Sequence, residues 1–325
     1  MSIHIRSYLN EDPPRLLSLW RKCQQRDQRL IPLSMNSLQM QTLGTPFFDR
    51  RSVMLAFDAD RAVGYVHCTP GPSADGSCLD PVTGQICFLC VDPAYPDRWG
   101  MAAALMTAAE NYLTGLGAKV IFGGSPRYCA PFYFGFYGGS EPLAFFDSDQ
   151  YITQTFLAAG YAPFKKTVRF HLNLTDYVSS MSPAMVGWSS RLELEHELPV
   201  YPKTWWQACA VANFQWMETM AYLSSSHRPI ARILLRIANP DAEHDETLYG
   251  RTWDAGLMHI GVHPDFRHQG IAAYVLGETL QHLVQQQRVA RIEAHIADDM
   301  PFTLNLLRSM KWNTVDTGTL FRKTV

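Results

Sequence analysis

Hydrophobic and polar positions follow two periods along the chain, and these periods predict a similar order of elements twice. Alternating or continuous apolar runs indicate strands, whereas a spacing of three and four residues indicates helices. The first half predicts strands over 3–8, 53–58, 62–68, 85–91 and 118–124, helices over about 13–25 and 101–116, and a Gly/Pro/Ser/Asp-rich loop over 70–83. The second half predicts a helix over about 203–214, a hairpin over 217–238, strands over 255–262, 290–296 and 318–325, and helices over 271–284 and 301–310.

The repeated order predicts an α/β protein with two related domains. Gly100 and Gly270 occupy matching places 170 positions apart, a period too long for a solenoid, whose repeats run roughly 20–50 residues. A length of 325 residues also favours about two domains. Between the halves lies a Ser-rich stretch with a proline. We therefore expect an N-terminal domain over 1–174, a linker over 175–190 and a C-terminal domain over 191–325.

One helix entry in the second half has the features of an anion site. The stretch HPDFRHQGIAAYVL (263–276) places Arg267 three residues before Gly270, where a helix is expected to begin. The first turn of a helix leaves N–H groups unpaired, and glycine lets an anion approach them closely. Arg267 adds donors suited to phosphate oxygens. A single glycine without G-K-[ST] excludes the dinucleotide fingerprint and the P-loop, so the stretch favours another kind of pyrophosphate site. A plain helix entry with a surface arginine is the alternative.

The stretch IGVHPDFRHQGIA, with the order of elements around it, resembles the GNAT superfamily of N-acetyltransferases. In that family [RQ]-x-x-G-x-[GA] follows a hydrophobic strand end. The resemblance implies two tandem GNAT-like domains, each a central mixed sheet flanked by helices, and acetyl-CoA or another short acyl-CoA as co-substrate. It also implies a pantetheine-binding strand end and a pyrophosphate-binding loop, formed by Ile260, Gly261 and Val262 and by Arg267, His268, Gln269, Gly270, Ile271, Ala272 and Ala273. A bulge or splay beside this strand is expected, because the arm needs unpaired backbone groups.

The first half contains a weaker copy of this motif. DRWGMA keeps Gly100 and Ala102, but Asp97 stands where the arginine is expected. A carboxylate repels a pyrophosphate unless it is paired or turned away, although Arg98 is a neighbouring cation that would compensate. We expect this copy to be retained for packing.

The usual proton donor of the family is missing from both halves. Acetyl transfer to an amine needs a neutral amine, a polarised carbonyl and a proton for the leaving thiolate. The family often takes this proton from a tyrosine, but Leu307 and Phe156 stand at the matching positions. An alternative alignment on PFYFGFYGG (131–139) offers Tyr133 or Tyr137.

Two polar residues near the motif are the candidate catalytic groups. His259 lies on the strand that leads into the motif, and Glu293 lies with His295 on one face of the next strand. Histidine titrates near neutral pH and suits a base, often through water. Ordinary strand residues with satisfied hydrogen bonds are the alternative. Asp254 is either an amine anchor or a turn residue, and the aromatic residues Trp205, Trp206, Phe214 and Trp216 either pack or wall an acceptor pocket.

Composition and charge exclude several other classes. The formal net charge is −2 and neither half is basic, so nucleic acid is not an expected partner. No apolar run approaches the roughly 18 residues of a membrane helix, and the first residues do not read as a signal peptide. Seven cysteines, an odd count, indicate reduced thiols in a cytoplasm, with Cys87 and Cys90 as buried thiols. The acidic residues around His244 (241–246) are typical of a solvated loop, and no metal is expected.

These observations predict an N-acetyltransferase. We expect the second half to move an acetyl group from acetyl-CoA directly to a primary amine of a small molecule or peptide, with a homodimer left open. The missing tyrosine favours one alternative from another class, a non-catalytic acyl-CoA-binding sensor.

Overall fold

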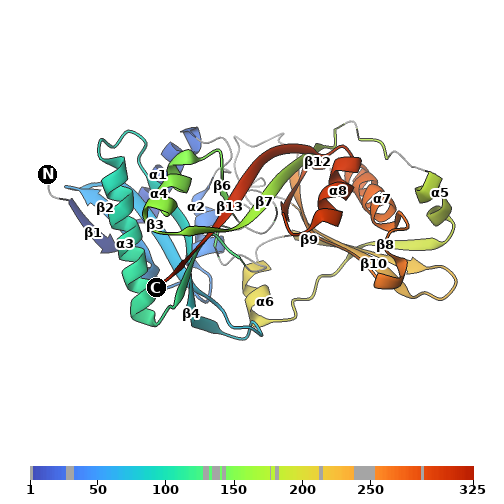
Figure 1. Ribbon diagram of the computed structural model, residues 1–325, viewed down its shortest axis with the longest axis horizontal. Helices are drawn as coiled ribbons and strands as arrows, with labels where there is room; N and C mark the ends of the chain where they lie inside the picture. Colours follow the sequence, from blue (N-terminus) through green and yellow to red (C-terminus); the bar gives the residue numbers. More distant parts are fainter. Residues whose placement is uncertain are drawn as a thin grey trace. The chain divides into compact units, whose positions relative to one another are not determined.

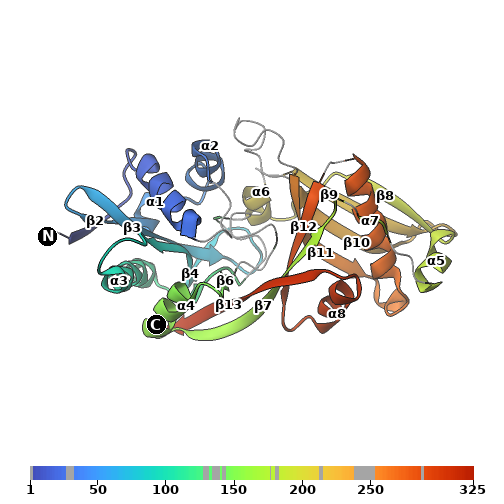
Figure 2. The same ribbon diagram turned by 90° about the horizontal axis from the view of Figure 1, so that it is seen from above.

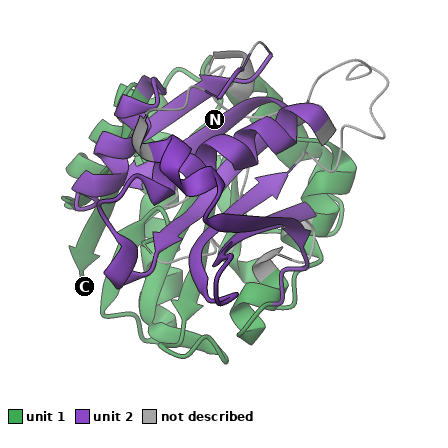
Figure 3. Ribbon diagram, turned by 90° about the vertical axis from the view of Figure 1, so that its right-hand side faces the viewer, with its two compact units in different colours: residues 1–167, 202–213, 316–325 green, residues 168–201, 214–315 purple. Residues whose placement is uncertain are grey.

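The computed structural model describes residues 3–26, 33–126, 132–133, 140, 144–175, 177–179, 183–211, 215–237, 253–286 and 289–325. The chain divides into two units, coloured separately in Figure 3. Unit 1 comprises residues 1–167, 202–213 and 316–325, and unit 2 comprises residues 168–201 and 214–315. This division differs from cuts after residues 174 and 190. Residues 168–174 and helix α5 (Pro183–Ser189) belong to unit 2 because Phe170, Leu174, Met185 and Trp188 lie in its core. The domain boundaries at 174 and 191 stay a prediction.

Unit 1 is a mixed sheet with helices packed against it (Figure 1). Its strand order is β1 (Ile3–Ser7), β2 (Val53–Asp58), β3 (Arg61–Pro72), β4 (Leu79–Val91), β5 (Val120–Gly123) and β13 (Asn313–Thr324). The first four strands pair antiparallel, β4 and β5 pair parallel, and Phe321–Thr324 of β13 pair antiparallel with β5. Its other elements include α1 (Pro13–Arg26), α2 (Met35–Leu38), α3 (Arg98–Leu116), α4 (Gln150–Ala158), α6 (Trp205–Val211) and β6 (Phe145–Phe146).

The predicted loop over Pro70–Thr83 is wrong at both ends. Strand β3 continues to Pro72 and β4 begins at Leu79, with Gly71 paired to Asp80. The register shifts after Pro70, so the ladder resumes beyond the first proline rather than ending there. The composition of residues 70–83 predicted a loop over the whole stretch, but only the six residues 73–78 lie between the two strands.

The core of unit 1 is rich in stacked aromatic rings. Trp20 stacks on Phe88 with ring centroids 4.7 Å apart, and Tyr133 lies 4.9 Å from Phe88. His67 is fully buried among these rings, and its Nδ1 lies 3.0 Å from the Tyr133 hydroxyl. Burial lowers the pKa of His67 to about 3, so this imidazole is neutral in the folded protein.

We expect acid to weaken unit 1 through His67. The unfolded chain binds a proton at this residue below its ordinary pKa of about 6.5, whereas the folded chain does so only near pH 3. The stabilisation that comes from keeping His67 neutral is therefore complete above pH 6.5. It decreases as the pH falls, by up to roughly 1.4 kcal/mol per pH unit. Between pH 7 and pH 5, the free energy of unfolding measured with urea should fall by roughly 2 kcal/mol less in His67→Phe than in the native protein. Equal losses in both proteins would contradict this origin.

Unit 2 repeats the architecture. Its strand order is β7 (Ala162–Asn173, from Val168 onward), β12 (Val289–Ala297), β11 (Trp253–Val262), β10 (Pro229–Ile237), β9 (Gln215–Leu223) and β8 (Leu192–Leu198). Helix α7 (Ile271–Gln286) packs on β9, β10 and β11 (Figure 2). Its apolar face includes Ile271, Val275 and Leu283. Helix α8 (Pro301–Ser309) adds Leu304 and Leu307 to the same core. None of the described helices has the length and apolar character that a membrane crossing requires.

Candidate acyl-CoA site

The parallel strands β11 and β12 of unit 2 separate part of the way along. They pair from Trp253 opposite Val289 to Gly256 opposite Glu293, and the pairing stops there. Both strands continue, β11 to Val262 and β12 to Ala297. We call the region between 257–262 and 294–297 the strand split. The predicted splay is thus present, and none of the described strands pairs with the β11 backbone edge that faces β12 over residues 257–262.

A β-bulge accompanies the split, and unit 1 contains its counterpart. On β11 the register against β10 shifts so that Leu234 pairs with His259 and Leu235 with Leu257, leaving Met258 as the extra residue. On β4 the same shift against β3 leaves Cys87 as the extra residue. Strand β4 likewise stops pairing with β5 after Ile86 and continues to Val91. The two units therefore share the split and the bulge, and what distinguishes them lies in their side chains and helix entries.

The loop from Arg267 to Gly270 opens the helix entry of unit 2. His268 and Gly270 have positive φ angles of 61° and 82°, and helix α7 begins only at Ile271. The first backbone bond of the helix runs from the Tyr274 N–H to the Gly270 carbonyl. Among the described residues, no acceptor is bonded to the N–H groups of residues 268–273. We call residues 267–273 the cradle, since these N–H groups are suited to receive an anion.

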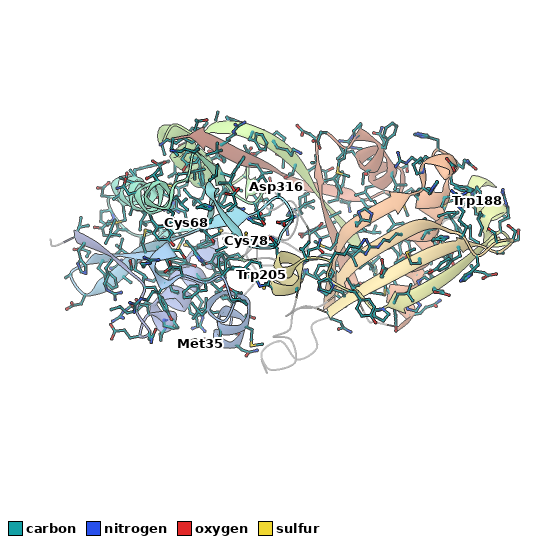
Figure 4. The ribbon with its side chains drawn as sticks, turned by 90° about the horizontal axis from the view of Figure 1, so that it is seen from below. Met35, Cys68, Cys78, Trp188, Trp205 and Asp316 are labelled. Atoms are coloured by element: carbon teal, nitrogen blue, oxygen red, sulfur yellow. The ribbon has the colours of Figure 1, made fainter. Side chains whose placement is uncertain are left out.

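Two contacts hold the cradle in place. Trp188 of α5, labelled in Figure 4, donates from Nε1 to the Gln269 carbonyl over 2.7 Å. Exposed Arg267 donates from Nε to the Val262 carbonyl over 3.0 Å. The arginine thus joins the cradle to the end of β11, and among the described residues no partner is bonded to its two terminal nitrogens.

The corresponding helix entry of unit 1 is closed by a carboxylate. Helix α3 begins at Arg98, before Gly100 instead of after it. The Asp97 side chain accepts from the Gly100 N–H over 3.0 Å, and a Cβ on Gly100 would lie 2.3 Å from that carboxylate. Arg98, the expected compensating cation, instead stacks on Tyr151 at 3.4 Å. A negative group therefore already occupies the place that a pyrophosphate would need.

The side chains that lie next to the bulge also differ between the two units. In each unit, one residue of the bulged strand pairs with the last residue of the neighbouring strand before the register shift. This residue is Phe88 in unit 1, opposite His67, and His259 in unit 2, opposite Leu234. Phe88 is buried under Trp20, whereas His259 is exposed, with Nε2 so close to Gly261 that a Cβ there would lie 2.8 Å away. Partial burial of the imidazole and the charge of Arg232 lower the pKa of His259, against an opposing effect of Glu218. His259 is therefore suited to be neutral at pH 7.

Glu293 lies at the closed end of the split within a buried cluster. Its Oε2 accepts from Arg169 Nε (2.9 Å) and Nη2 (2.5 Å) and lies 2.6 Å from His171 Nε2, while Oε1 lies 2.9 Å from His295 Nε2. Burial alone would raise the pKa of Glu293, but hydrogen bonds from the two histidines and the charges of His295 and Arg169 hold it well below its usual range. We call these four residues the Glu293 cluster. A carboxylate held in this way is a fixed negative charge and a weak base.

Other sequence candidates lie in the hydrophobic core of unit 2, in unit 1 or outside the described residues. Leu307 and Phe156 are fully buried in the cores of unit 2 and unit 1, and Tyr133 is the buried partner of His67. Trp205 and Trp206 pack with Phe47 in unit 1. Tyr137, Phe214 and residues 241–246 lie outside the described residues, as does the side chain of Asp254.

Sequence reasoning missed Arg169 and His171, because it did not predict β7. A signal was present: Val168, Phe170 and Leu172 alternate with polar residues, the period of a half-buried strand. That pattern places Arg169 and His171 together on the face opposite the core residue Phe170.

The structure of unit 2 is thus a mixed α/β sheet, split at a bulge beside a helix entry whose first N–H groups have no acceptor among the described residues. The family model described as "Acetyltransferase (GNAT) family" matches residues 14–136 and 188–311. The chain therefore belongs to the GNAT acetyltransferase family, with two GNAT regions in tandem, as its resemblance had implied.

Solved structures show the same tandem fold at low sequence identity. A tandem GNAT protein from the clavulanic acid biosynthesis pathway is 14% identical with a TM-score of 0.69, covering 99% of this chain and 98% of that one. A GCN5-related N-acetyltransferase from Sphaerobacter thermophilus is also 14% identical, with a TM-score of 0.65 and coverages of 99% and 95%. A glucosamine N-acetyltransferase region of a fungal multi-domain β-N-acetylglucosaminidase is 17% identical, with a TM-score of 0.72 and coverages of 99% and 38%. Comparison with curated protein sequences finds no match.

Proposed function

We propose that unit 2 is the catalytic half of an acetyl-CoA-dependent N-acyltransferase. The observation that carries this proposal is the contrast between the two helix entries. The cradle of unit 2 offers N–H groups with no acceptor among the described residues, whereas Asp97 caps the entry of unit 1. The pyrophosphate would bind at residues 267–273, and the pantetheine arm would pair with the free backbone edge of 260–262.

The acceptor would be a primary amine of a small molecule or peptide, and transfer would be direct. The closed end of the split is at Gly256, which pairs with Glu293. The register of β11 against β10 puts His259 on the same face of the sheet as Glu293. A thioester in the split and an amine on that face would meet without an acyl-enzyme, so proximity supplies much of the rate. Neutral His259 would take the proton from the amine, directly or through water. Glu293 would act as a fixed charge that orients its partners.

A non-catalytic acyl-CoA-binding sensor is the second candidate, and one observation favours it. The two positions that match the family tyrosine hold Leu307 and Phe156, both buried in cores. Incubating the protein with acetyl-CoA and a panel of primary amines, and measuring free CoA, separates the candidates. Amine-dependent CoA release supports the enzyme, whereas tight binding without release supports the sensor. We expect the protein to work in the cytoplasm, because its six described cysteines are free thiols, and we leave a homodimer open.

Arg267→Ala should weaken CoA binding by about 10- to 100-fold with the fold intact. A charge-assisted hydrogen bond to a pyrophosphate is worth roughly 1.5–3 kcal/mol, and Arg267→Lys should recover part of it. Calorimetry with CoA, dephospho-CoA and pantetheine checks the cause. The first two ligands should lose equally and pantetheine should be indifferent. An equal loss of affinity for pantetheine would mean that Arg267 acts by holding the strand end through its bond to Val262, and that Arg267 does not contact the pyrophosphate.

A further inference from the structure

The Glu293 cluster contains one histidine with a nitrogen left for a substrate. The His171 Nε2 is engaged by Glu293 at 2.6 Å, and among the described residues no partner is bonded to its Nδ1. The His171 side chain is 19% exposed, whereas that of His295 is 1% exposed. Of the two histidines that contact Glu293, only His171 is therefore accessible to a ligand.

The contacts of His171 are those of an oriented acid–base group. A carboxylate bonded to one imidazole nitrogen fixes the orientation of the ring and leaves the other nitrogen for proton transfer. The negative charge of Glu293 also compensates the charge that His171 gains when it carries a proton. Arg169, bonded to the same carboxylate oxygen, keeps Glu293 ionised and in place.

The cluster lies where the reacting bond is expected. Glu293 pairs with Gly256, the last residue before β11 and β12 separate. Gly256 is opposite Arg236 and His259 is opposite Leu234 on β10, so Glu293 and His259 share one face of the sheet. A thioester held in the split thus has His259 on its β11 side and the Glu293 cluster at its closed end.

We propose that His171 supplies the proton to the sulfur of CoA as the thioester breaks, a role that rests on the proposed function. The amine nitrogen forms a bond to the carbonyl carbon and loses a proton to His259. The carbon–sulfur bond then breaks, its electron pair stays on sulfur, and the Nδ1–H of protonated His171 moves to that sulfur. Solvent returns one proton to His171 and removes one from His259, so the products are an amide and neutral CoA thiol. His171 replaces the tyrosine absent from positions 307 and 156.

The test compares two substitutions at His171 with one at an exposed histidine of the same unit. His171→Ala should lower kcat by about 100-fold and leave acetyl-CoA affinity within about twofold. His171→Gln should be equally slow, because its amide can still donate to Glu293 but cannot exchange protons. His227→Asn, on the exposed turn between β9 and β10, should keep the native rate.

Rescue by an added acid–base group separates proton transfer from a structural role. Imidazole added to His171→Ala should restore turnover in proportion to its concentration. A native protein that releases CoA with amines, together with unchanged turnover in both variants, would overturn this role alone. A slow His171→Ala variant whose turnover does not respond to imidazole would also overturn it. A native protein that binds CoA but releases none with any amine would overturn the proposed function and this role together.

Discussion

Replacing Gly270 with glutamate is expected to abolish acetyl-CoA binding. Gly270 has a φ of 82° and lies in the loop whose N–H groups have no acceptor among the described residues. A glutamate there brings a negative charge and a side chain to the position that a pyrophosphate must approach, in a backbone conformation that L side chains rarely adopt. Isothermal calorimetry should show no measurable binding, and circular dichroism should show a folded protein.

The matched control is Gly100→Glu at the corresponding place in unit 1. That site already contains the Asp97 carboxylate, so the substitution displaces a helix cap, at a cost of about 1 kcal/mol, and leaves acetyl-CoA binding nearly unchanged. Equal losses of binding in the two variants would show that unit 1 takes part in CoA binding and that the Asp97 cap opens.

His259→Ala and Glu293→Gln should each lower turnover by on the order of 100-fold, with little change in CoA affinity. The reasons differ. His259→Ala removes the base that faces the amine, whereas Glu293→Gln removes the charge that holds Arg169, His171 and His295. Steady-state kinetics and calorimetry on the same preparations separate the effect on kcat from the effect on binding. Unchanged kcat in both variants would leave proximity and solvent as the only sources of rate.

The pH profile distinguishes these two variants further. His259 must be neutral to accept a proton, and its pKa is lowered, so the acidic fall in the native rate should lie below pH 6.5. His259→Ala should lack this fall. Glu293→Gln leaves buried Arg169 without its counter-charge, so its thermal unfolding has to be compared with that of the native protein. If that variant unfolds, His259→Ala alone tests the base.

The local parts of this site were predictable from sequence, and the long-range parts were not. Arg267, Gly270 and the helix after them follow from a short stretch with known helix-entry chemistry, and the split follows from the family resemblance. The roles of His259 and Glu293 stay predictions, but the sequence did not indicate that Glu293 is held by a strand more than 120 positions earlier. Hydrophobic periodicity reports which face a residue occupies, not which strand becomes its neighbour.

The same limit applies to the first half. DRWGMA shows an acidic residue near a helix start, and the sequence left open whether Asp97 is paired or turned away. The structure resolves this, because α3 begins three positions earlier relative to its glycine than α7 does. An aspartate caps a helix well, and the cap closes the loop that unit 2 leaves open.

The position of β13 affects the order in which the two halves of the protein complete their folding during synthesis. Strand β5 of unit 1 gains its antiparallel partner from Phe321–Thr324, about 200 residues after Gly123 in the chain. On a ribosome that adds 5–20 residues per second, the half that emerges first would wait roughly 10–40 s for this strand. During that time the edge of β5 is open to pairing with another nascent chain. Sharing a strand between the halves thus makes the earliest part of the protein the last to be completed.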